Sequence, residues 1–219
     1  MPEGFLQGLS DEEAAAFRGA GHERAYGPNV TLVHEGDDAG PVIVLLRGQV
    51  KIVKLAEGGR EAIVAVRGEG DLVGELAAID GGPRSTSVTT LGPVEVLLVP
   101  RSEFTALLEQ RPRMALVILR MVAARLRYAG AQQAQLGTHD VVGRLAQRLL
   151  ELSERFGVRG ERGIEIELPL SQEELASWIG ASREAVSKAF KVLRSARIVE
   201  TSRRRVTILD VDALEQRGR

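Results

Sequence analysis

Two short helices joined by a tight turn are predicted for residues 171–193, which read SQEELASWIGASREAVSKAFKVL. This pair of helices restricts the folds that the chain can adopt. Ser171 and Glu174 have the spacing of a capping box at the start of the first helix. Gly180 is placed to end that helix, because glycine accepts the left-handed backbone found at helix ends. Ser182 is a good cap for the second helix, whose apolar positions recur at helical spacing. These positions are Val186, Ala189, Phe190 and Leu193.

The second helix is expected to expose Arg183, Glu184, Ser187 and Lys188 at its start. An arginine and a carboxylate there match the acceptors and donors of base edges in the DNA major groove, as in a helix-turn-helix. Residues 182–205 include eight basic residues and two acidic ones, although the formal net charge of the whole chain is -1. This concentration of positive charge indicates a phosphate-binding surface. The alternative is an ordinary helical hairpin with a solvated polar face.

Two short apolar stretches, residues 198–200 and 206–209, predict a hairpin with Arg203, Arg204 and Arg205 at its tip. A hairpin beside a recognition helix is a wing, and its arginines can contact phosphates without reading the base sequence. The candidate DNA-binding residues are Ser171, Gln172, Ser182, Arg183, Glu184, Ser187, Lys188 and Arg203.

The composition excludes several classes of protein. The 219 residues include no cysteine, which rules out disulfides, thiolate zinc sites and cysteine-ligated iron–sulfur clusters. The N-terminal residues lack the pattern of a secretion signal, and no stretch approaches the roughly 18 apolar residues of a membrane span. We therefore expect a soluble cytoplasmic protein with no membrane partner. The first 170 residues carry 19 basic and 23 acidic side chains, so this part is not expected to bind nucleic acid by itself.

The first half of the chain has the pattern of an antiparallel β protein. Residues 10–19 predict a short helix that is capped by Ser10 and ended by Gly19. Short stretches rich in valine, isoleucine and leucine then alternate with glycine-containing turns, at a spacing of about 8 to 12 residues that is typical of a barrel or sandwich. The expected strands are residues 31–33, 42–46, 50–55, 62–66, 85–90 and 94–99. We expect these strands to form a jelly roll.

A long helix is predicted from about Glu103, with Pro112 in an early turn. Its apolar or neutral positions alternate steps of four and three residues, which is the heptad pattern of a two-stranded coiled coil. These positions, the heptad seam, are Ala115, Leu119, Val122, Leu126, Ala129, Gln133 and Leu136. The seam favours a parallel homodimer, and a single helix packed on the barrel is the alternative.

Gly137 is expected to end the long helix, and residues 137–140 form the expected linker to the last domain. Asp140 has the position of a cap for a further amphipathic helix. After that helix, residues 156–163 predict an exposed loop and residues 164–168 predict a strand that leads into the helix pair.

Residues 74–86, GELAAIDGGPRST, bring together a permanent cation, several donors and an acceptor. Arg84 supplies the cation, Ser85 and the backbone around it the donors, and Glu75 the acceptor, a set that suits a cyclic phosphodiester with a ribose hydroxyl. The candidate ligand-binding residues of this segment are Gly74, Glu75, Leu76, Arg84, Ser85 and Thr86. A solvated surface ion pair is the alternative, because such pairs are common and contribute little.

The order of these parts, with GELAAIDGGPRST in the barrel and GASREAVSKAF in the helix pair, resembles the CRP/FNR family of bacterial transcription regulators over essentially the whole chain. Within the family, the similarity is greatest to the cyclic AMP receptor proteins. The resemblance implies an α+β fold with an N-terminal antiparallel jelly roll that binds an effector, a long dimerisation helix and a C-terminal winged helix-turn-helix. The expected domains are residues 1–110, 111–137 and 138–219, respectively.

The resemblance also implies partners. A homodimer would form through residues 111–137 and bind a palindromic operator on double-stranded DNA, with half-sites similar to GTG. Arg183 and Glu184 are implied to contact bases, and Lys188 stands where relatives often carry arginine. RNA polymerase is a further implied partner.

Cyclic AMP is the implied effector, with Arg125 of the long helix directed toward the nucleotide. The family places a threonine–serine pair near the base, whereas this chain has Ala129 and Gly130, which lack the hydroxyls to hydrogen-bond adenine. Three alternatives follow: cyclic GMP or another cyclic nucleotide, a regulator active without ligand, and a nucleotide-binding module that acts through protein partners.

No metal and no catalytic site are expected. His22, His34 and His139 stand in no ligand motif, so neither haem nor another metal is assigned. A cupin-like enzyme built on the barrel is the rival class, but the sequence has no cluster of histidine and carboxylate ligands and no nucleophile–base pair. We therefore expect a protein that is not an enzyme.

Overall fold

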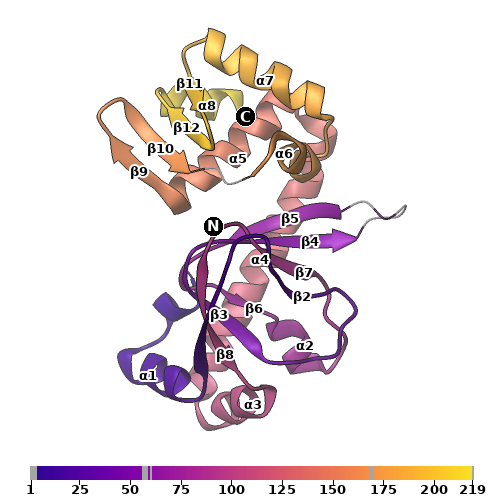
Figure 1. Ribbon diagram of the computed structural model, residues 1–219, viewed down its shortest axis with the longest axis vertical. Coiled ribbons are helices and arrows are strands. Elements are labelled where there is room, and N and C mark those ends of the chain that lie inside the picture. The colour runs from indigo at the N-terminus through magenta and orange to yellow at the C-terminus, as the bar shows by residue number, and fades with distance from the viewer. Residues whose placement is uncertain (1–3, 56–58, 60, 168–169, 219) are drawn as a thin grey trace. The chain divides into compact units, whose positions relative to one another are not determined.

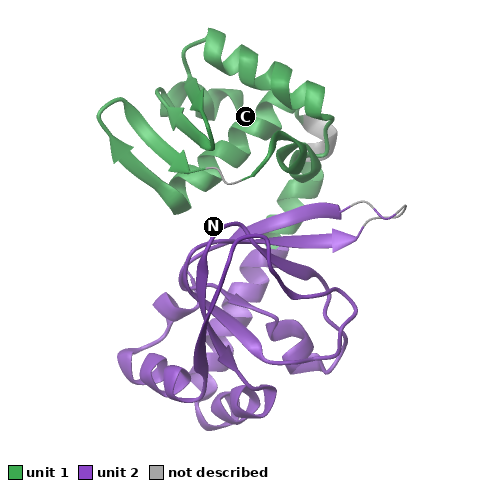
Figure 2. Cartoon of the chain, viewed as in Figure 1, with its two compact units in different colours: residues 1, 127–219 green, residues 2–126 purple. Residues whose placement is uncertain are grey.

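A computed structural model of the protein describes residues 4–55, 59, 61–167 and 170–218, with the backbone alone described for residues 135–138. The chain divides into two compact units, residues 2–126 and 127–219 (Figure 2). The boundary falls within the long helix α4 (Pro112–Thr138), so each unit contains part of this helix.

The first unit is built around two four-stranded antiparallel sheets, with strand orders β1-β8-β3-β6 and β2-β7-β4-β5 (Figure 1). The strands are β1 (His22–Tyr26), β2 (Thr31–Val33), β3 (Val42–Arg47), β4 (Val50–Leu55), β5 (Glu61–Arg67), β6 (Leu72–Val73), β7 (Ser87–Thr90) and β8 (Val94–Val99). Side chains from both sheets pack together between them, among them Ile43, Ile52 and Leu98. These sheets confirm the predicted α+β fold with an antiparallel jelly roll.

The sequence pattern missed two of these strands and misplaced the start of a third. β1 pairs only with β8, and four of its five residues are exposed, so it lacks the alternation that marks a strand. β6 has only two residues. β7 begins at Ser87 rather than Ser85, which leaves Ser85 and Thr86 outside the sheet.

Helices cover the outer face of the β1-β8-β3-β6 sheet. They are η1 (Leu6–Gly8), α1 (Asp11–Gly19), α3 (Arg101–Gln110) and the first part of α4. Val42 and Val44 of β3 face these helices, whereas Ile43 and Leu45 face the other sheet. Burial on both faces explains why this strand is a continuous apolar run.

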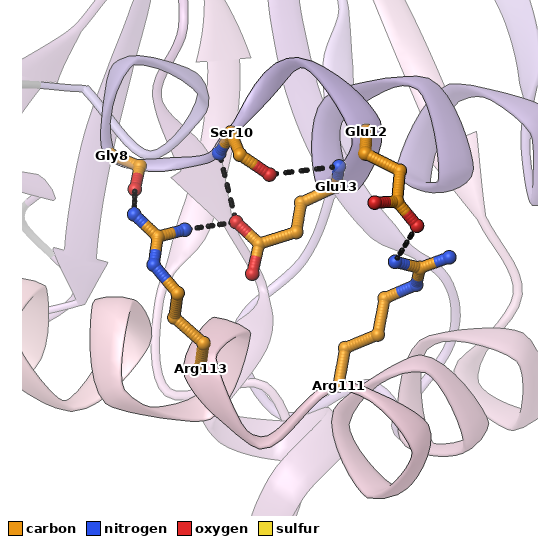
Figure 3. A network of polar contacts seen from close by, with 6 residues as sticks. All are labelled: Gly8, Ser10, Glu12, Glu13, Arg111 and Arg113. Atoms are coloured by element: carbon orange, nitrogen blue, oxygen red, sulfur yellow. Dashed lines mark hydrogen bonds and ion pairs between the residues drawn. The ribbon is translucent and has the colours of Figure 1, made fainter.

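Polar contacts hold α1 against the start of α4 (Figure 3). The predicted cap Ser10 is confirmed: its backbone N–H donates to Glu13 Oε2 at 2.8 Å, and its hydroxyl accepts from the Glu13 N–H. Arg113 donates to the same carboxylate, and Arg111 donates to Glu12 at 2.9 Å. The Ser10 backbone N–H lowers the pKa of Glu13, and Arg113 acts in the same direction. Glu13 is therefore ionised at neutral pH and accepts from both partners.

The long helix is continuous from Pro112 to Thr138. It runs past Gly137, where we expected it to end, so only His139 and Asp140 separate it from α5 (Val141–Phe156). A glycine within a helix costs only about 1 kcal/mol, so it does not by itself end a helix. Among the described residues, no helix is both long enough and apolar enough to cross a membrane.

Packing against the barrel leaves part of the heptad seam of α4 exposed. A neighbouring stripe of the helix is buried there and consists of Met114, Ile118 and Met121, and the seam residue Val122 packs partly against the same core. On the seam, Leu119 is 62% exposed and Leu126 is 73% exposed. Leu136, the last seam position, lies outside the described side chains. The barrel therefore leaves Leu119 and Leu126 of the seam exposed.

Over its described residues, the second unit combines the end of α4 and four further helices with a sheet of strand order β11-β12-β10-β9. After α5, its elements are β9 (Gly157–Gly160), β10 (Gly163–Glu167), α6 (Gln172–Ile179), α7 (Arg183–Ser195), β11 (Val199–Ser202), β12 (Arg205–Ile208) and α8 (Val211–Arg217). The Asp140 side chain caps α5 as predicted, by accepting from the Gly143 N–H at 2.8 Å.

One prediction in this unit was wrong, and one helix was missed. Residues 156–163 were expected to form a loop, but β9 pairs with β10 in an antiparallel hairpin. Three of the four β9 residues are exposed, so only backbone hydrogen bonds mark it as a strand. The C-terminal helix α8 was not predicted, and Leu168 of the expected strand lies outside the described residues.

Candidate functional site

A cavity of about 310 Å³ lies in the first unit, between the β2-β7-β4-β5 sheet, α2 (Glu75–Asp80) and α4. All seven candidate ligand-binding residues line it, namely Gly74, Glu75, Leu76, Arg84, Ser85, Thr86 and Arg125. The apolar part of the lining, here called the apolar wall, includes Val33, Ile52, Val73 and Val88, and the charged part is called the polar wall. The volume is at the lower end of the range for small-molecule sites, and this mixed lining suits a ligand with a charged part and an apolar part.

Arg84 forms the cationic part of the polar wall and is only 4% exposed. Its Nη1 donates to the Gly74 carbonyl at 2.8 Å, and its Nη2 donates to the Pro41 carbonyl at 2.7 Å. Burial lowers the pKa of Arg84, while the carboxylates of Asp37 and Glu75 oppose this shift. Because arginine stays protonated in proteins, the wall carries a permanent positive charge that suits a phosphate.

Gly74 makes this arrangement possible. Its φ of 81° lies in the left-handed region, and a Cβ on it would fall 2.2 Å from Arg84 Nη1. Both the backbone conformation and the close approach of the guanidinium therefore require glycine at this position.

Glu75 and Arg125 connect the cavity to the long helix. Arg125 Nη1 donates to Glu75 Oε1 at 2.7 Å, and Arg125 Nη2 donates to the Leu72 carbonyl at 2.8 Å. Glu75 is 3% exposed, so neither it nor Arg84 belongs to a solvated surface pair. A buried carboxylate with four lone-pair positions can accept from Arg125 and from a ligand hydroxyl together.

Sequence reasoning missed Arg67, which follows the apolar residues of β5 and also lines the cavity. It is 7% exposed, and its Nη1 donates to the Val66 carbonyl at 3.2 Å. No spacing signal marks an arginine at the end of a strand, so only the fold brings it to the cavity. Val122 and Leu126 of the heptad seam line the cavity too, which means that the cavity and the seam share residues.

Ala129 and Gly130 follow Arg125 on α4, and both are exposed. Neither offers a hydroxyl to a nucleotide base. The hydroxyls that line the cavity belong to Ser85, which is exposed, and to Thr86, which is half-buried.

The predicted helix-turn-helix is present as α6 and α7, with both predicted caps. The Ser171 hydroxyl accepts from the Glu174 N–H at 3.1 Å, and the Ser182 hydroxyl accepts from the Ala185 N–H at 3.2 Å. Gly180 ends α6 with a φ of 62°, the left-handed conformation that the turn requires.

Arg144 of α5 fixes this turn from outside the helix pair. Its Nε donates to the Ile179 carbonyl at 2.8 Å, and its Nη2 donates to the Gly180 carbonyl at 3.3 Å. Carbonyl groups at the end of a helix lack intrahelical donors, and Arg144 supplies them here. The orientation of α6 is thereby tied to α5.

The start of α7 presents the predicted polar face. All eight candidate DNA-binding residues are exposed, from Ser171 to Arg203. The backbone N–H of Glu184 and the Ser182 hydroxyl lower the pKa of Glu184, and Arg183 and Lys188 act in the same direction. Glu184 is therefore a carboxylate at neutral pH, which can accept a hydrogen bond but not donate one.

The wing is the β11–β12 hairpin. Arg203 and Arg204 are exposed at its tip, and Arg204 has a φ of 57°. Arg205 does not lie at the tip as predicted, because it belongs to β12 and donates to Glu165 Oε2 of β10 at 2.9 Å. Two of the three arginines are therefore available at the turn.

A jelly-roll barrel with a cation-lined cavity, a long helix and a winged helix-turn-helix together define an effector-binding transcription regulator. Residues 23–111 match the cyclic nucleotide-binding domain family, and residues 143–217 match the Crp-like helix-turn-helix domain family. The chain is 32% identical to the CRP-like cAMP-activated global transcriptional regulator of Mycobacterium tuberculosis, over 99% of this chain and 96% of that protein. The chain belongs to the CRP/FNR family of transcription regulators, which is not a family of enzymes.

Two further proteins show how broad the similarity is. The chain is 30% identical to the global nitrogen regulator of Synechocystis, over 93% of this chain and 94% of that protein. The structure of FixK2 from Bradyrhizobium japonicum matches with a TM-score of 0.81 and 25% identity, over 91% of this chain and 98% of that structure.

Proposed function

We propose that the protein is a dimeric, sequence-specific regulator that cyclic AMP gates through the barrel cavity and that binds a palindromic operator with GTG-type half-sites. The observation that carries the proposal is the gathering of the buried Arg84, the buried Glu75 and Arg125 of α4 around one cavity. The similarity to cAMP-activated regulators supports the choice of effector. The cytoplasm is the proposed location and RNA polymerase a proposed partner.

Each part of the nucleotide has a proposed partner in the cavity. Arg84 pairs with the cyclic phosphate, and the hydroxyls of Ser85 and Thr86 donate to its oxygens. Glu75 accepts from the ribose hydroxyl while it keeps its bond to Arg125. The base lies against the apolar wall and makes contacts that need no hydroxyl group.

Dimerisation is proposed to occur through residues 111–137, between a barrel domain of residues 1–110 and a DNA-binding domain of residues 138–219. The exposed leucines at positions 119 and 126 support this interface, since a coiled-coil seam buries such residues against a second helix. A two-fold dimer can then place two recognition helices about 34 Å apart, on one side of the duplex.

Gating is proposed to act on this spacing. The unliganded dimer holds its recognition helices at a separation that does not fit the two half-sites of the operator. Cyclic AMP favours the separation that fits, by displacing α4 through Arg125. A ligand shifts an equilibrium only by its preference for one state, so operator DNA must tighten cyclic AMP binding by the same factor.

One observation favours a second candidate function. Ala129 and Gly130 supply no hydrogen bond to adenine, which suits a family member that responds to cyclic GMP or that binds its operator without any ligand.

Operator binding by the purified protein at fixed salt distinguishes these candidates. Duplexes with paired GTG half-sites and scrambled duplexes are titrated without ligand, with cyclic AMP and with cyclic GMP. We expect specific binding that rises with cyclic AMP, because the ligand prefers the competent state. Specific binding that ignores both nucleotides favours the ligand-independent candidate, and binding that does not distinguish the two duplexes contradicts the proposed operator.

Replacing Arg183 by alanine is expected to weaken specific binding by about 1–3 kcal/mol, and only at a guanine position of the half-site. The fork of N–H groups on arginine matches guanine O6 and N7, so no other base restores the contact. Competition titrations with each base substituted in turn measure this loss. Arg203→Ala at the wing is the comparison, since it is expected to weaken all sequences equally. An equal loss on all sequences for Arg183→Ala would make it a phosphate contact.

A further inference from the structure

Arg148 of α5 is buried, with 7% of its surface exposed, and neither candidate site uses it. Its Nη1 donates to Glu151 Oε2 at 2.8 Å and also to the Tyr128 hydroxyl. The Tyr128 hydroxyl in turn donates to the same Glu151 oxygen. These three side chains form a closed triangle of hydrogen bonds that joins the second half of α4 to α5.

The same guanidinium reaches the helix-turn-helix. Arg148 Cζ lies 5.1 Å from the centre of the Trp178 ring of α6 and 5.7 Å from the centre of the Tyr128 ring. Both distances are within the range of cation–π attraction, and Trp178 is only 6% exposed. Tyr128, Arg148, Glu151 and Trp178, here called the Arg148 cluster, therefore connect α4, α5 and α6 through one buried cation.

The cluster is incompletely satisfied. Arg148 Nε and Trp178 Nε1 are buried and have no hydrogen-bond acceptor among the described residues. Buried donors without acceptors are unfavourable, so this packing is less stable than a fully satisfied one would be. A conformational switch requires a packed contact that can take two arrangements.

The cluster is also close to the cavity along the chain. Tyr128 follows Arg125 by three residues on α4, which is less than one turn and about 4.5 Å along the helix axis. Arg125 lines the cavity and donates to Glu75. A helix is stiff over one turn, so a displacement of Arg125 displaces Tyr128 as well.

We infer that the Arg148 cluster positions the helix-turn-helix according to the state of α4, and that effector gating passes through it. The inference rests on the proposed function, because it concerns the route of the same gating. Tyr128 and Arg148 are positioning residues: neither lines the cavity, and neither is a candidate DNA contact.

Tyr128→Phe is the sharpest test, because it removes one hydroxyl and keeps the ring beside the guanidinium. The Arg148–Glu151 ion pair stays, so the domain retains its buried charge pair. Tyr26→Phe is the matched control, since Tyr26 is the other of the two tyrosines and lies in β1, away from the cavity lining. We measure cyclic AMP affinity without DNA, and operator affinity with and without cyclic AMP.

The expected result is a loss of coupling without a loss of binding. In the wild-type protein and in Tyr26→Phe, cyclic AMP raises operator affinity by about 5- to 150-fold, the usual range of allosteric coupling. In Tyr128→Phe this factor falls to about one, while cyclic AMP affinity without DNA is unchanged. A lower unfolding temperature with an unchanged coupling factor would make the cluster purely structural and overturn the inference.

Trp178 gives a second, independent readout. It is the one tryptophan of the chain, so its fluorescence reports on the Arg148 cluster alone. Adding cyclic AMP to the full-length protein is expected to change this emission, because the stacked cation moves relative to the indole. The change is expected to be retained in Tyr26→Phe and lost in Tyr128→Phe. An identical response in all three proteins contradicts the inference.

The wild-type protein separates this inference from the proposed function. If its operator affinity responds to neither cyclic AMP nor cyclic GMP, the proposed gating has failed. The positioning role of the Arg148 cluster is then tested on ligand-free protein. There, Tyr128→Phe is expected to weaken binding to paired half-sites but not to a single half-site. An unchanged ratio of the two affinities overturns the positioning role.

Discussion

Replacing Arg84 by glutamine is expected to raise the dissociation constant for cyclic AMP by about two to three and a half orders of magnitude. Arg84 is 4% exposed and supplies the permanent charge of the polar wall. Removing one partner of a buried charge pair costs about 3–5 kcal/mol, and about 1.4 kcal/mol corresponds to a tenfold change in affinity. Titration calorimetry of the purified protein with cyclic AMP measures this loss.

The matched control for this substitution is Arg101→Gln. Arg101 also donates to a backbone carbonyl, that of Ala78 at 3.1 Å, but it does not line the cavity. Because glutamine at position 84 also leaves the Gly74 and Pro41 carbonyls without their donors, thermal unfolding of both variants accompanies the titration. Wild-type affinity in a folded Arg84→Gln protein would remove Arg84 from the effector site.

Replacing Leu119 by glutamate is expected to raise the dissociation constant of the dimer by about 10²- to 10⁴-fold. In a parallel two-fold coiled coil, the same seam residue of each protomer meets its own copy. Each buried leucine contributes about 1.5–3 kcal/mol, and the substitution removes both and places two like charges together. Sedimentation equilibrium over a range of protein concentrations measures the change.

Leu119 is a better choice than Leu126, because Leu126 also lines the cavity. Leu55→Glu is the control: Leu55 is 60% exposed on β4, so the same change occurs on an exposed apolar residue outside the seam. The Leu119 variant is also expected to lose its preference for paired over single half-sites. A dimer as stable as that of the control would place the dimer interface elsewhere than on the seam.

The helix ends are the part of the fold that the sequence predicted most accurately. Ser10, Asp140, Ser171 and Ser182 all cap the helices expected of them, and Gly180 ends α6 in the left-handed conformation. A cap is a hydrogen bond between residues three positions apart, so its signal is fully contained in a short stretch of sequence. The buried strands were found for a similar reason, because a strand such as β3 is a continuous apolar run.

The strands that were missed lack such a local signal. β1 is a mostly exposed edge strand, and β9 is an exposed strand within a hairpin, so neither has an apolar pattern. Each exists because a neighbouring strand offers its backbone groups. Edge pairing of this kind depends on where the partner lies and leaves little trace in residue type.

The sequence by itself determined the order of the parts, the caps of the helices, the positive charge around α7 and the seven residues of the candidate effector site. The tertiary structure decided which charged groups are buried and with what they pair. Arg125 meets Glu75 across 50 positions of sequence, and Arg84 meets the Pro41 carbonyl across 43. Periodicity and capping act over a few residues, whereas burial and pairing depend on groups that only the folded chain brings together. For that reason Arg67 at the cavity and the Arg148 cluster were found only in the structure.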